Sequence, residues 1–181
     1  SGGTATFSDK NFGISKTVTG TGFTLSDSNY SVGTINTTTA NITKRTLDVT
    51  ADGDDKVYDG TVSATVDFDD DRVSGDNLNI TGTATFADKH VGNNKAVSVV
   101  GILVTGTDAV NYTANTTTNT TANITPRAIT VTGAANTKVY NATTGAAALP
   151  TITVGAIQTG DSAVRSETYD DKNVGTGKTM I

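Results

Sequence analysis

The stretch Lys95–Val104, which reads Lys-Ala-Val-Ser-Val-Val-Gly-Ile-Leu-Val, decides the fold class of this chain. Apolar residues alternate with small or polar ones up to Gly101, and branching at Cβ favours an extended, half-buried strand over a helix. Gly101 interrupts the run before Ile102, which predicts a bulge or a sharp bend. The stretch is typical of an all-β protein.

Shorter alternating segments lie on both sides of this stretch. Turns of Gly, Asn and Asp separate them, in a chain with 19 Gly and only 2 Pro. The predicted strands are Ala64–Phe68, Thr83–Asp88, Tyr112–Thr116, Thr120–Thr125 and Ala128–Thr132. Many short strands without a helical period predict immunoglobulin-like β-sandwiches. A β-grasp is the alternative, disfavoured because no helix is predicted to lie across a sheet.

The sequence repeats itself at a spacing of 82 residues. Lys56–Gly60 (Lys-Val-Tyr-Asp-Gly) returns 82 residues later as Lys-Val-Tyr-Asn-Ala, and Asn41–Thr50 returns at the same spacing. A third block, Phe/Tyr-x-Asp-Lys followed by Asn or His, occurs three times. Its Asp-Lys pairs are Asp9-Lys10, Asp88-Lys89 and Asp171-Lys172. Several blocks in one order indicate tandem repeats of about 82 residues.

These blocks divide the chain into three copies. Residues 1–43 are the C-terminal part of a first copy, residues 44–125 a complete middle copy, and residues 126–181 the N-terminal part of a last copy. The chain therefore reads as an excerpt of a longer array. Almost no linker separates the copies, so we expect closely coupled junctions and neighbouring repeats as partners.

Charge and composition exclude several classes of function. The net charge of −5 and the pI near 4.6 argue against binding nucleic acid or an anionic membrane. No apolar run reaches the length of a membrane-spanning helix, so no membrane insertion is expected. Without Cys, the chain has no disulfide and no thiolate metal site.

The repeated motifs resemble those of a known family. Lys-Val-Tyr-Asp-Gly at Lys56–Gly60, Phe-x-Asp-Lys-x-Val-Gly at Phe86–Gly92, Asn111-Tyr112, and Ile-Thr-Pro-Arg at Ile124–Arg127 are similar to the YDG/MBG-type repeats of very large bacterial exoproteins, such as filamentous-haemagglutinin-like proteins and large adhesins. The resemblance implies a secreted, surface-held fibre that acts in attachment, biofilm or extracellular matrix, and it implies no catalytic residues. Asn141-Ala142 departs from the motif.

The motif residues are interpreted as structural. The Tyr58-Asp59-Gly60 segment is predicted to end a strand in a turn, where Asp59 accepts a backbone N–H bond and Gly60 takes a positive φ. Asn141 can make the same turn bond, which favours structure over ligand binding. The remaining structural motif residues are Asp88, Lys89, Gly92, Asn111 and Tyr112. No nucleophile or second carboxylate accompanies Asp88-Lys89 in every copy, so we expect no catalytic residues and no enzyme.

Clustered aspartates raise a calcium hypothesis. The candidate ligands are Asp69, Asp70, Asp71 and Asp76, since Ca²⁺ takes six to eight oxygen ligands. The segment of the last copy that aligns with a neighbouring acidic cluster, Gly133–Thr137, lacks carboxylates. A solvated loop with no bound metal or cofactor is therefore favoured.

Asn-x-Ser/Thr sequons are abundant. They begin at Asn29, Asn36, Asn41, Asn79, Asn111, Asn115, Asn119, Asn123 and Asn141. They could mark a glycosylated surface, but several belong to the repeat and are counted twice, which is the favoured explanation. The Thr-rich segment Asn115–Thr121 is predicted to be an ordered, exposed strand whose edge could pair with another chain.

Three functions are compatible with these observations. The first is a structural stalk or fibre module of a large secreted adhesin at the bacterial cell surface, with an unidentified host or matrix receptor. The second is a self-assembling subunit of an extracellular filament or sheath, in which copies of the chain pair with each other. The third is a carbohydrate-binding module, disfavoured because the chain has no Trp and only five Tyr and five Phe.

Overall fold

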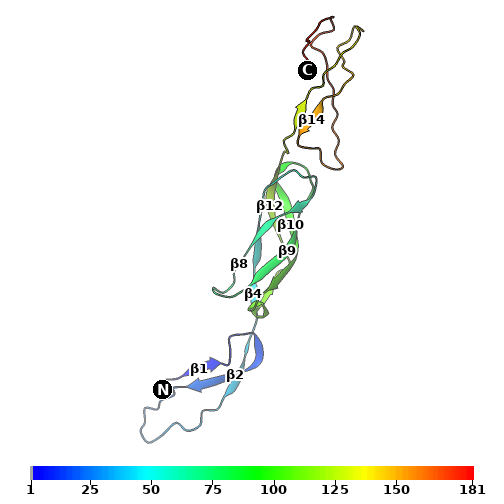
Figure 1. The fold of residues 1–181 in the computed structure, drawn as a ribbon. Coiled ribbons are helices and arrows are strands. Elements are labelled where there is room, and N and C mark those ends of the chain that lie inside the picture. The colour runs from blue at the N-terminus through cyan, green and yellow to red at the C-terminus, as the bar shows by residue number, and fades with distance from the viewer. Residues whose placement is uncertain (1) are drawn as a thin grey trace. The chain divides into compact units, whose positions relative to one another are not determined.

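The computed structural model describes residues 2–181, and the all-β prediction is confirmed in them. They contain fourteen strands and one short 3-10 helix, η1 (Ala109–Asn111) (Figure 1). Among the described residues, no helix is long and apolar enough to cross a membrane.

The strands form five sheets. A three-stranded antiparallel sheet has the order β1-β2-β3, with β1 Thr4–Phe7, β2 Gly13–Thr21 and β3 Thr38–Ile42. A five-stranded sheet has the order β6-β12-β10-β9-β7, with β6 Lys56–Val57, β7 Ser63–Ala64, β9 Asn79–Phe86, β10 Gly92–Thr105 and β12 Thr117–Thr125. The pairs are β4 Arg45–Leu47 with β11 Tyr112–Ala114 (parallel), β5 Val49–Gly53 with β8 Val66–Asp70 (antiparallel), and β13 Thr130–Thr132 with β14 Thr151–Val154 (antiparallel).

Two compact units make up the chain. Unit 1 contains the described residues up to Asp54, together with Ala64–Thr85 and Ala96–Thr121. Unit 2 contains Asp55–Ser63, Phe86–Lys95 and Ala122–Ile181. The division falls inside the middle copy, so each unit combines part of that copy with a neighbouring partial copy.

Equivalent sequence blocks form equivalent strands. Strands β1, β2 and β3 of the first copy occupy the repeat positions of β9, β10 and β12, and both sets are neighbours in that order. Strands β13 and β14 of the last copy occupy the positions of β5 and β8, and both pairs are antiparallel. The middle copy alone contains both sets within the described residues.

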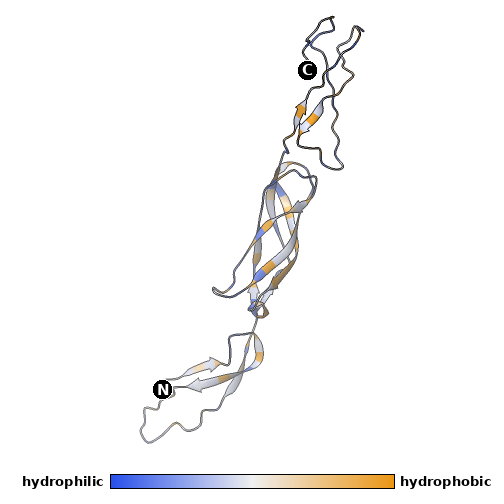
Figure 2. Ribbon diagram, in the orientation of Figure 1, coloured by the Kyte–Doolittle hydropathy of each residue, from blue (hydrophilic) through white to orange (hydrophobic). Residues whose placement is uncertain are grey.

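The buried apolar residues all belong to the middle copy. In unit 1 they are Leu47, Val49, Ala51, Leu78, Ala84, Val97, Val99, Ile102 and Tyr112, and in unit 2 they are Phe86, Ala122 and Ile124. Figure 2 shows apolar and polar residues interspersed along these strands. In unit 1, a Cβ at Gly82 of β9 would lie 3.0 Å from the Phe68 ring of β8 and 3.3 Å from Val99 of β10. Strand β8 of the β5–β8 pair therefore packs closely against β9 and β10, and a side chain at Gly82 would force Phe68 or Val99 to shift.

Strand β10 is irregular at Gly101, as predicted from the sequence. Strand β10 continues through Gly101, which has a φ of +66°. Burial alternates at Val97 and Val99 and then resumes at Ile102, so two successive residues face outward. This change of phase is the effect of a bulge.

Several strand limits differ from the prediction. Strand β9 begins at Asn79 rather than Thr83, and β12 begins at Thr117 within the Thr-rich segment. The predicted exposed edge is only partly free, because β12 lies between β10 and β6 in the sheet order. In the described residues, β6 pairs with β12 only at Ile124 and Thr125.

Candidate functional site

The Tyr58-Asp59-Gly60 turn is organised by a lysine. The Lys56 Nζ donates to Asp59 Oδ1 at 2.9 Å, to the Thr61 carbonyl at 2.9 Å and to the Ser63 carbonyl at 2.8 Å. The same ammonium lies 5.4 Å from the centroid of the Phe86 ring, a cation–π distance. Asp59 Oδ1 also accepts the Thr61 N–H at 2.9 Å. Lys56 therefore closes the loop over a buried aromatic ring.

The last copy builds the same loop with different residues. Lys138 Nζ donates to the Thr143 and Gly145 carbonyls and lies 5.4 Å from the centroid of the Tyr169 ring. Asn141 Oδ1 accepts the Thr143 N–H at 3.2 Å, as Asp59 does for Thr61. Gly60 has a φ of +81°, and Ala142 at the equivalent position has +64°. The turn thus keeps its left-handed residue even where alanine replaces glycine, at an energetic cost.

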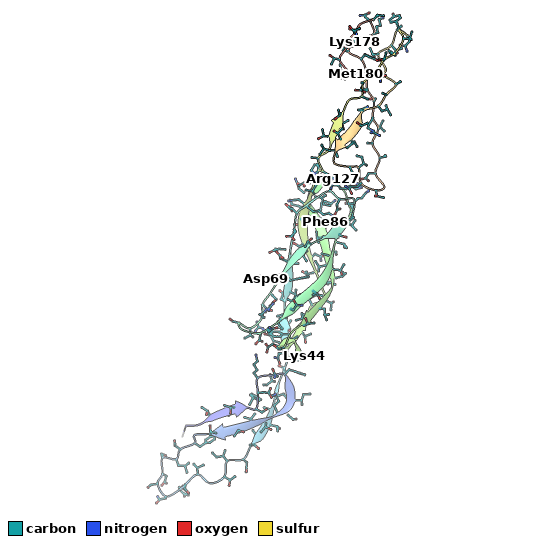
Figure 3. All side chains as sticks on the ribbon, viewed as in Figure 1. Lys44, Asp69, Phe86, Arg127, Lys178 and Met180 are labelled. Carbon is teal, nitrogen blue, oxygen red and sulfur yellow. The ribbon has the colours of Figure 1, made fainter. Side chains whose placement is uncertain are left out.

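The carboxylate of each Asp-Lys pair fixes its own loop. Asp88 Oδ1 accepts the His90 N–H at 2.8 Å and the Lys95 Nζ at 2.6 Å. Asp9 makes the same two bonds with Asn11 and Lys16, and Asp171 makes them with Asn173 and Lys178. Lys178, the lysine that closes the third of these loops, is labelled in Figure 3. The three loops are therefore built alike.

The glycine of this motif makes room for the second lysine. A Cβ at Gly92 would lie 3.4 Å from the Lys95 side chain, and one at Gly13 would lie 3.1 Å from the Lys16 side chain. Neither glycine has a positive φ. A side chain at Gly13 would therefore press on the Lys16 stem, whereas one at Gly92 would lie at an ordinary van der Waals distance from Lys95.

In unit 2, the lysine of the Asp-Lys pair contacts the following copy. Lys89 Nζ donates to Asp161 Oδ1 at 2.6 Å, and Tyr58 Oη donates to Asp161 Oδ2 at 2.5 Å. The ammonium also lies 6.0 Å from the centroid of the Tyr58 ring. One carboxylate of the last copy is thus held by two motif residues of the middle copy.

In unit 1, the equivalent lysine makes the equivalent contact. Lys10 Nζ of the first copy donates to Asp76 Oδ1 at 2.8 Å and forms a 2.7 Å ion pair with Asp108. Asp76 Oδ2 accepts the Tyr112 Oη at 2.7 Å. Next to this contact, the Asn111 side chain accepts the Phe12 N–H at 2.7 Å. The lysine occupies the same repeat position in both units. The tyrosine does not, because Tyr58 binds the aspartate in unit 2 and Tyr112 binds it in unit 1.

The acceptor is a recurring acidic turn. Gly75-Asp76 and Gly160-Asp161 each end a four-residue turn. The Asp76 N–H donates to the Val73 carbonyl at 3.1 Å, and the Asp161 N–H donates to the Gln158 carbonyl at 3.0 Å. Gly75 and Gly160 have φ values of +92° and +87°. Glycine therefore sets each turn and presents the next side chain, a carboxylate.

The ionisation of these groups follows from their partners. Hydrogen bonds from Lys89 and Tyr58 lower the pKa of Asp161, and the Asp161 carboxylate raises the pKa of Lys89. Hydrogen bonds from Lys56 and the Thr61 N–H lower the pKa of Asp59 to about 2. These shifts favour the ionised carboxylates of Asp161 and Asp59 that bind the neighbouring lysines.

The four calcium candidates are each engaged in the structure. The Asp70 carboxylate binds the Arg72 guanidinium, Asp71 binds Arg45 and the Asp48 N–H, and Asp69 accepts the Asp70 N–H. Asp76 binds Lys10, as described above. In the part of the chain that the structure describes, no group of three or more His, Cys, Asp or Glu could hold a metal ion.

Several sequon asparagines carry structural hydrogen bonds. The Asn41 and Asn123 side chains accept the N–H groups of Ser15 and Asn94, which have φ values of +54° and +48°. The Asn115 Nδ2 donates to the carbonyls of Val49 and Thr117. Asn119 accepts the Ser98 hydroxyl, Asn79 donates to Thr105, and Asn141 makes the turn bond described above. Within residues 2–181, the side chains of Asn29 and Asn36 make no hydrogen bond.

Comparison with known proteins places the chain in a family. The YDG domain model matches residues 43–121 and 125–181, together more than half of the chain. The chain belongs to the YDG domain family. Searches of curated proteins and of solved structures found no match. The tyrosine, aspartate and glycine of this YDG chain thus form a turn held by Lys56, with the tyrosine hydroxyl directed to Asp161.

Three features of the site were absent from the sequence interpretation. They are the anchoring role of Lys56, the pairing of Lys95 with Asp88, and the acceptor Asp161. Each had a signal in the sequence. Lys56 returns as Lys138, and a lysine follows the motif aspartate by seven residues in all three copies. Gly-Asp likewise recurs at 75–76 and 160–161.

Proposed function

We propose that this chain is a non-enzymatic stalk or fibre module of a large secreted bacterial surface adhesin, contributing to attachment or to extracellular matrix. Its copies supply length and rigidity, and its charged motif residues fix turns and junctions rather than reacting atoms. Each complete copy is, in this proposal, an immunoglobulin-like β-sandwich. The β-grasp alternative needs a helix that lies across the sheet. The described residues contain only one short 3-10 helix, η1, of three residues.

The observation that carries the proposal is the recurrence of one contact at two junctions. Lys10 binds Asp76 of the following copy, and Lys89 binds Asp161 of the copy after that. A chain selected for catalysis or ligand capture has no need to repeat such a contact at each junction, whereas a stalk does. Repeat arrays gain their stability from contacts between neighbours.

Sedimentation velocity of the isolated chain tests the proposal. A stalk module should sediment as a monomer with a high frictional ratio, at every concentration from micromolar to millimolar. A low frictional ratio, typical of a compact globule, would contradict it. A variant that combines Lys10→Gln with Lys89→Gln should have a lower frictional ratio if the junction contacts provide rigidity.

Exposed apolar side chains favour a second candidate, self-assembly into a filament or sheath. Ile14 of the first copy is 78 % exposed, and Val139 and Val174 of the last copy are 89 % and 88 % exposed. Apolar surface left open in this way can be covered by another chain. In the same experiment, sedimentation coefficients that rise with concentration would establish this candidate and exclude a monomeric stalk.

A further inference from the structure

The last copy repeats a binding surface that is occupied in the middle copy. In the middle copy this surface consists of Tyr58, Lys89 and Val91. Tyr58 and Val91 line one hollow together with Asp161. Lys89 forms an ion pair with the same Asp161. The equivalent residues of the last copy are Tyr140, Lys172 and Val174. We call these three residues the acidic-turn face.

The acidic-turn face is open. Tyr140 is 56 % exposed and Val174 is 88 % exposed. Tyr140, Lys172 and Val174 line one surface pocket. Among the described residues, Lys172 forms no ion pair, whereas both Lys10 and Lys89 do. The face therefore has the residues of the occupied surface without its carboxylate.

The loops that carry this face are already fixed. The Lys172 loop is closed by the Asp171 carboxylate, which accepts from Asn173 and Lys178. The Tyr140 loop is closed by Lys138 and by the Asn141 turn bond. A surface held in its binding conformation before contact loses little conformational entropy on binding.

We propose that Tyr140, Lys172 and Val174 bind the Gly-Asp turn of a further YDG-type copy. Lys172 pairs with one carboxylate oxygen and Tyr140 donates to the other, as Lys89 and Tyr58 do for Asp161. The chemistry that recognises this partner is a carboxylate presented directly after a glycine of positive φ, as at Gly160. The inference rests on the proposed stalk function, in which successive copies contact each other.

A chain extended by one further copy tests this assignment. Residues 1–181 are followed directly by a second copy of residues 99–181, because Ile181 occupies the repeat position of Ser98. The added segment completes the last copy and supplies a new Gly160-Asp161 turn. Ser162→Ala in the added segment alone changes the mass of its tryptic peptide. A water-soluble carbodiimide then couples paired carboxylates and amines, with net loss of water, and mass spectrometry identifies the linked peptides.

The expected result is a link between Lys172 and the mass-marked Asp161, at a yield similar to that of the link between Lys89 and the unmarked Asp161. Tyr140→Ala should lower the yield of the Lys172 link and leave the Lys89 link unchanged. A Lys89 link without a Lys172 link would overturn the inference and leave the stalk proposal intact. Loss of both links in a chain with an unchanged circular dichroism spectrum would overturn the junction contact itself, and the inference with it.

Discussion

The middle copy and the last copy share a sequence pattern but differ in burial. Leu47 and Val49 of the middle copy are 0 % and 1 % exposed, whereas Ile129 and Val131, their equivalents in the last copy, are 39 % and 48 % exposed. The middle copy has the β5–β8 pair and the β9-β10-β12 strands, while the last copy has only the equivalents of the former. A sheet buries its apolar face only against a second layer. We therefore propose that one complete copy is the smallest segment of this chain with an apolar core.

The largest effect expected from this comparison comes from truncating one leucine in each copy. Leu47→Ala should lower the free energy of unfolding by about 2–5 kcal/mol, because it leaves a cavity in the core. Leu149→Ala, at a position 52 % exposed in the last copy, should change it by less than about 0.5 kcal/mol. Urea denaturation followed by circular dichroism measures both. Equal losses would show that the last copy has a core of its own.

A smaller effect is expected from exchanging the turn residues. Ala142→Gly should stabilise the last copy by about 1 kcal/mol, since alanine has a positive φ there. Gly60→Ala should destabilise the middle copy by about 1–2 kcal/mol. Its new Cβ would also lie 3.0 Å from the Cβ of Gln158.

Thermal unfolding of the two variants against the parent chain measures these differences. Loss of stability in Ala142→Gly would mean that the two turns are not equivalent. The Asn141-Ala142 variation would then be more than a strained version of the Asp-Gly turn.

The sequence predicted the strands well because their signal is local. Alternation depends on neighbouring residues, and Lys95–Val104 forms a strand as predicted. The predicted strand Ala64–Phe68 is instead broken at Thr65, so that Ala64 ends β7 and Val66–Phe68 belong to β8 in another sheet. The repeat also indicated that Tyr58-Asp59-Gly60 is a turn, because Asn141 can replace Asp59.

The sequence could not predict which residues meet across copies. Asp161 lies 72 residues from Lys89, and although Gly-Asp recurs in the sequence, nothing in the pattern indicates that Lys89 is its partner. The parallel pairing of β4 with β11 joins Arg45 to Tyr112 and likewise has no local signal. Asp76 was interpreted as a calcium candidate because clustered aspartates are visible in sequence, whereas the distant Lys10 that pairs with it is not.

The acid stability of the two turns should differ. The pKa of Asp59 is lowered to about 2 in the folded chain, so unfolding at low pH takes up a proton. Its contribution to stability is present above the unfolded pKa of about 3.9 and is lost as the pH falls towards 2. Asp59→Asn should therefore reduce the decline in urea midpoint between pH 4 and 2.

The control for this experiment is Asn141→Asp. It introduces a titrating group into the last copy and should increase the decline over the same pH range. An unchanged pH profile for both variants would mean that these side chains do not contribute to the stability of their turns.

The smallest effect is expected at the junction. Lys89→Gln removes the ion pair with Asp161, so it should lower the melting temperature slightly at low salt and less at high salt. Lys172→Gln is the matched control, because Lys172 forms no ion pair in residues 2–181. Identical melting curves for the two variants at low salt would show that the junction contact adds nothing to stability.

Hydrogen exchange across the intact chain tests most directly whether a complete copy is needed for a core. The account predicts slow exchange for amides of β10 and β12 around Val97, Val99 and Ile124, and much faster exchange for amides in residues 139–149 of the last copy. Equal protection of the middle and last copies would contradict it.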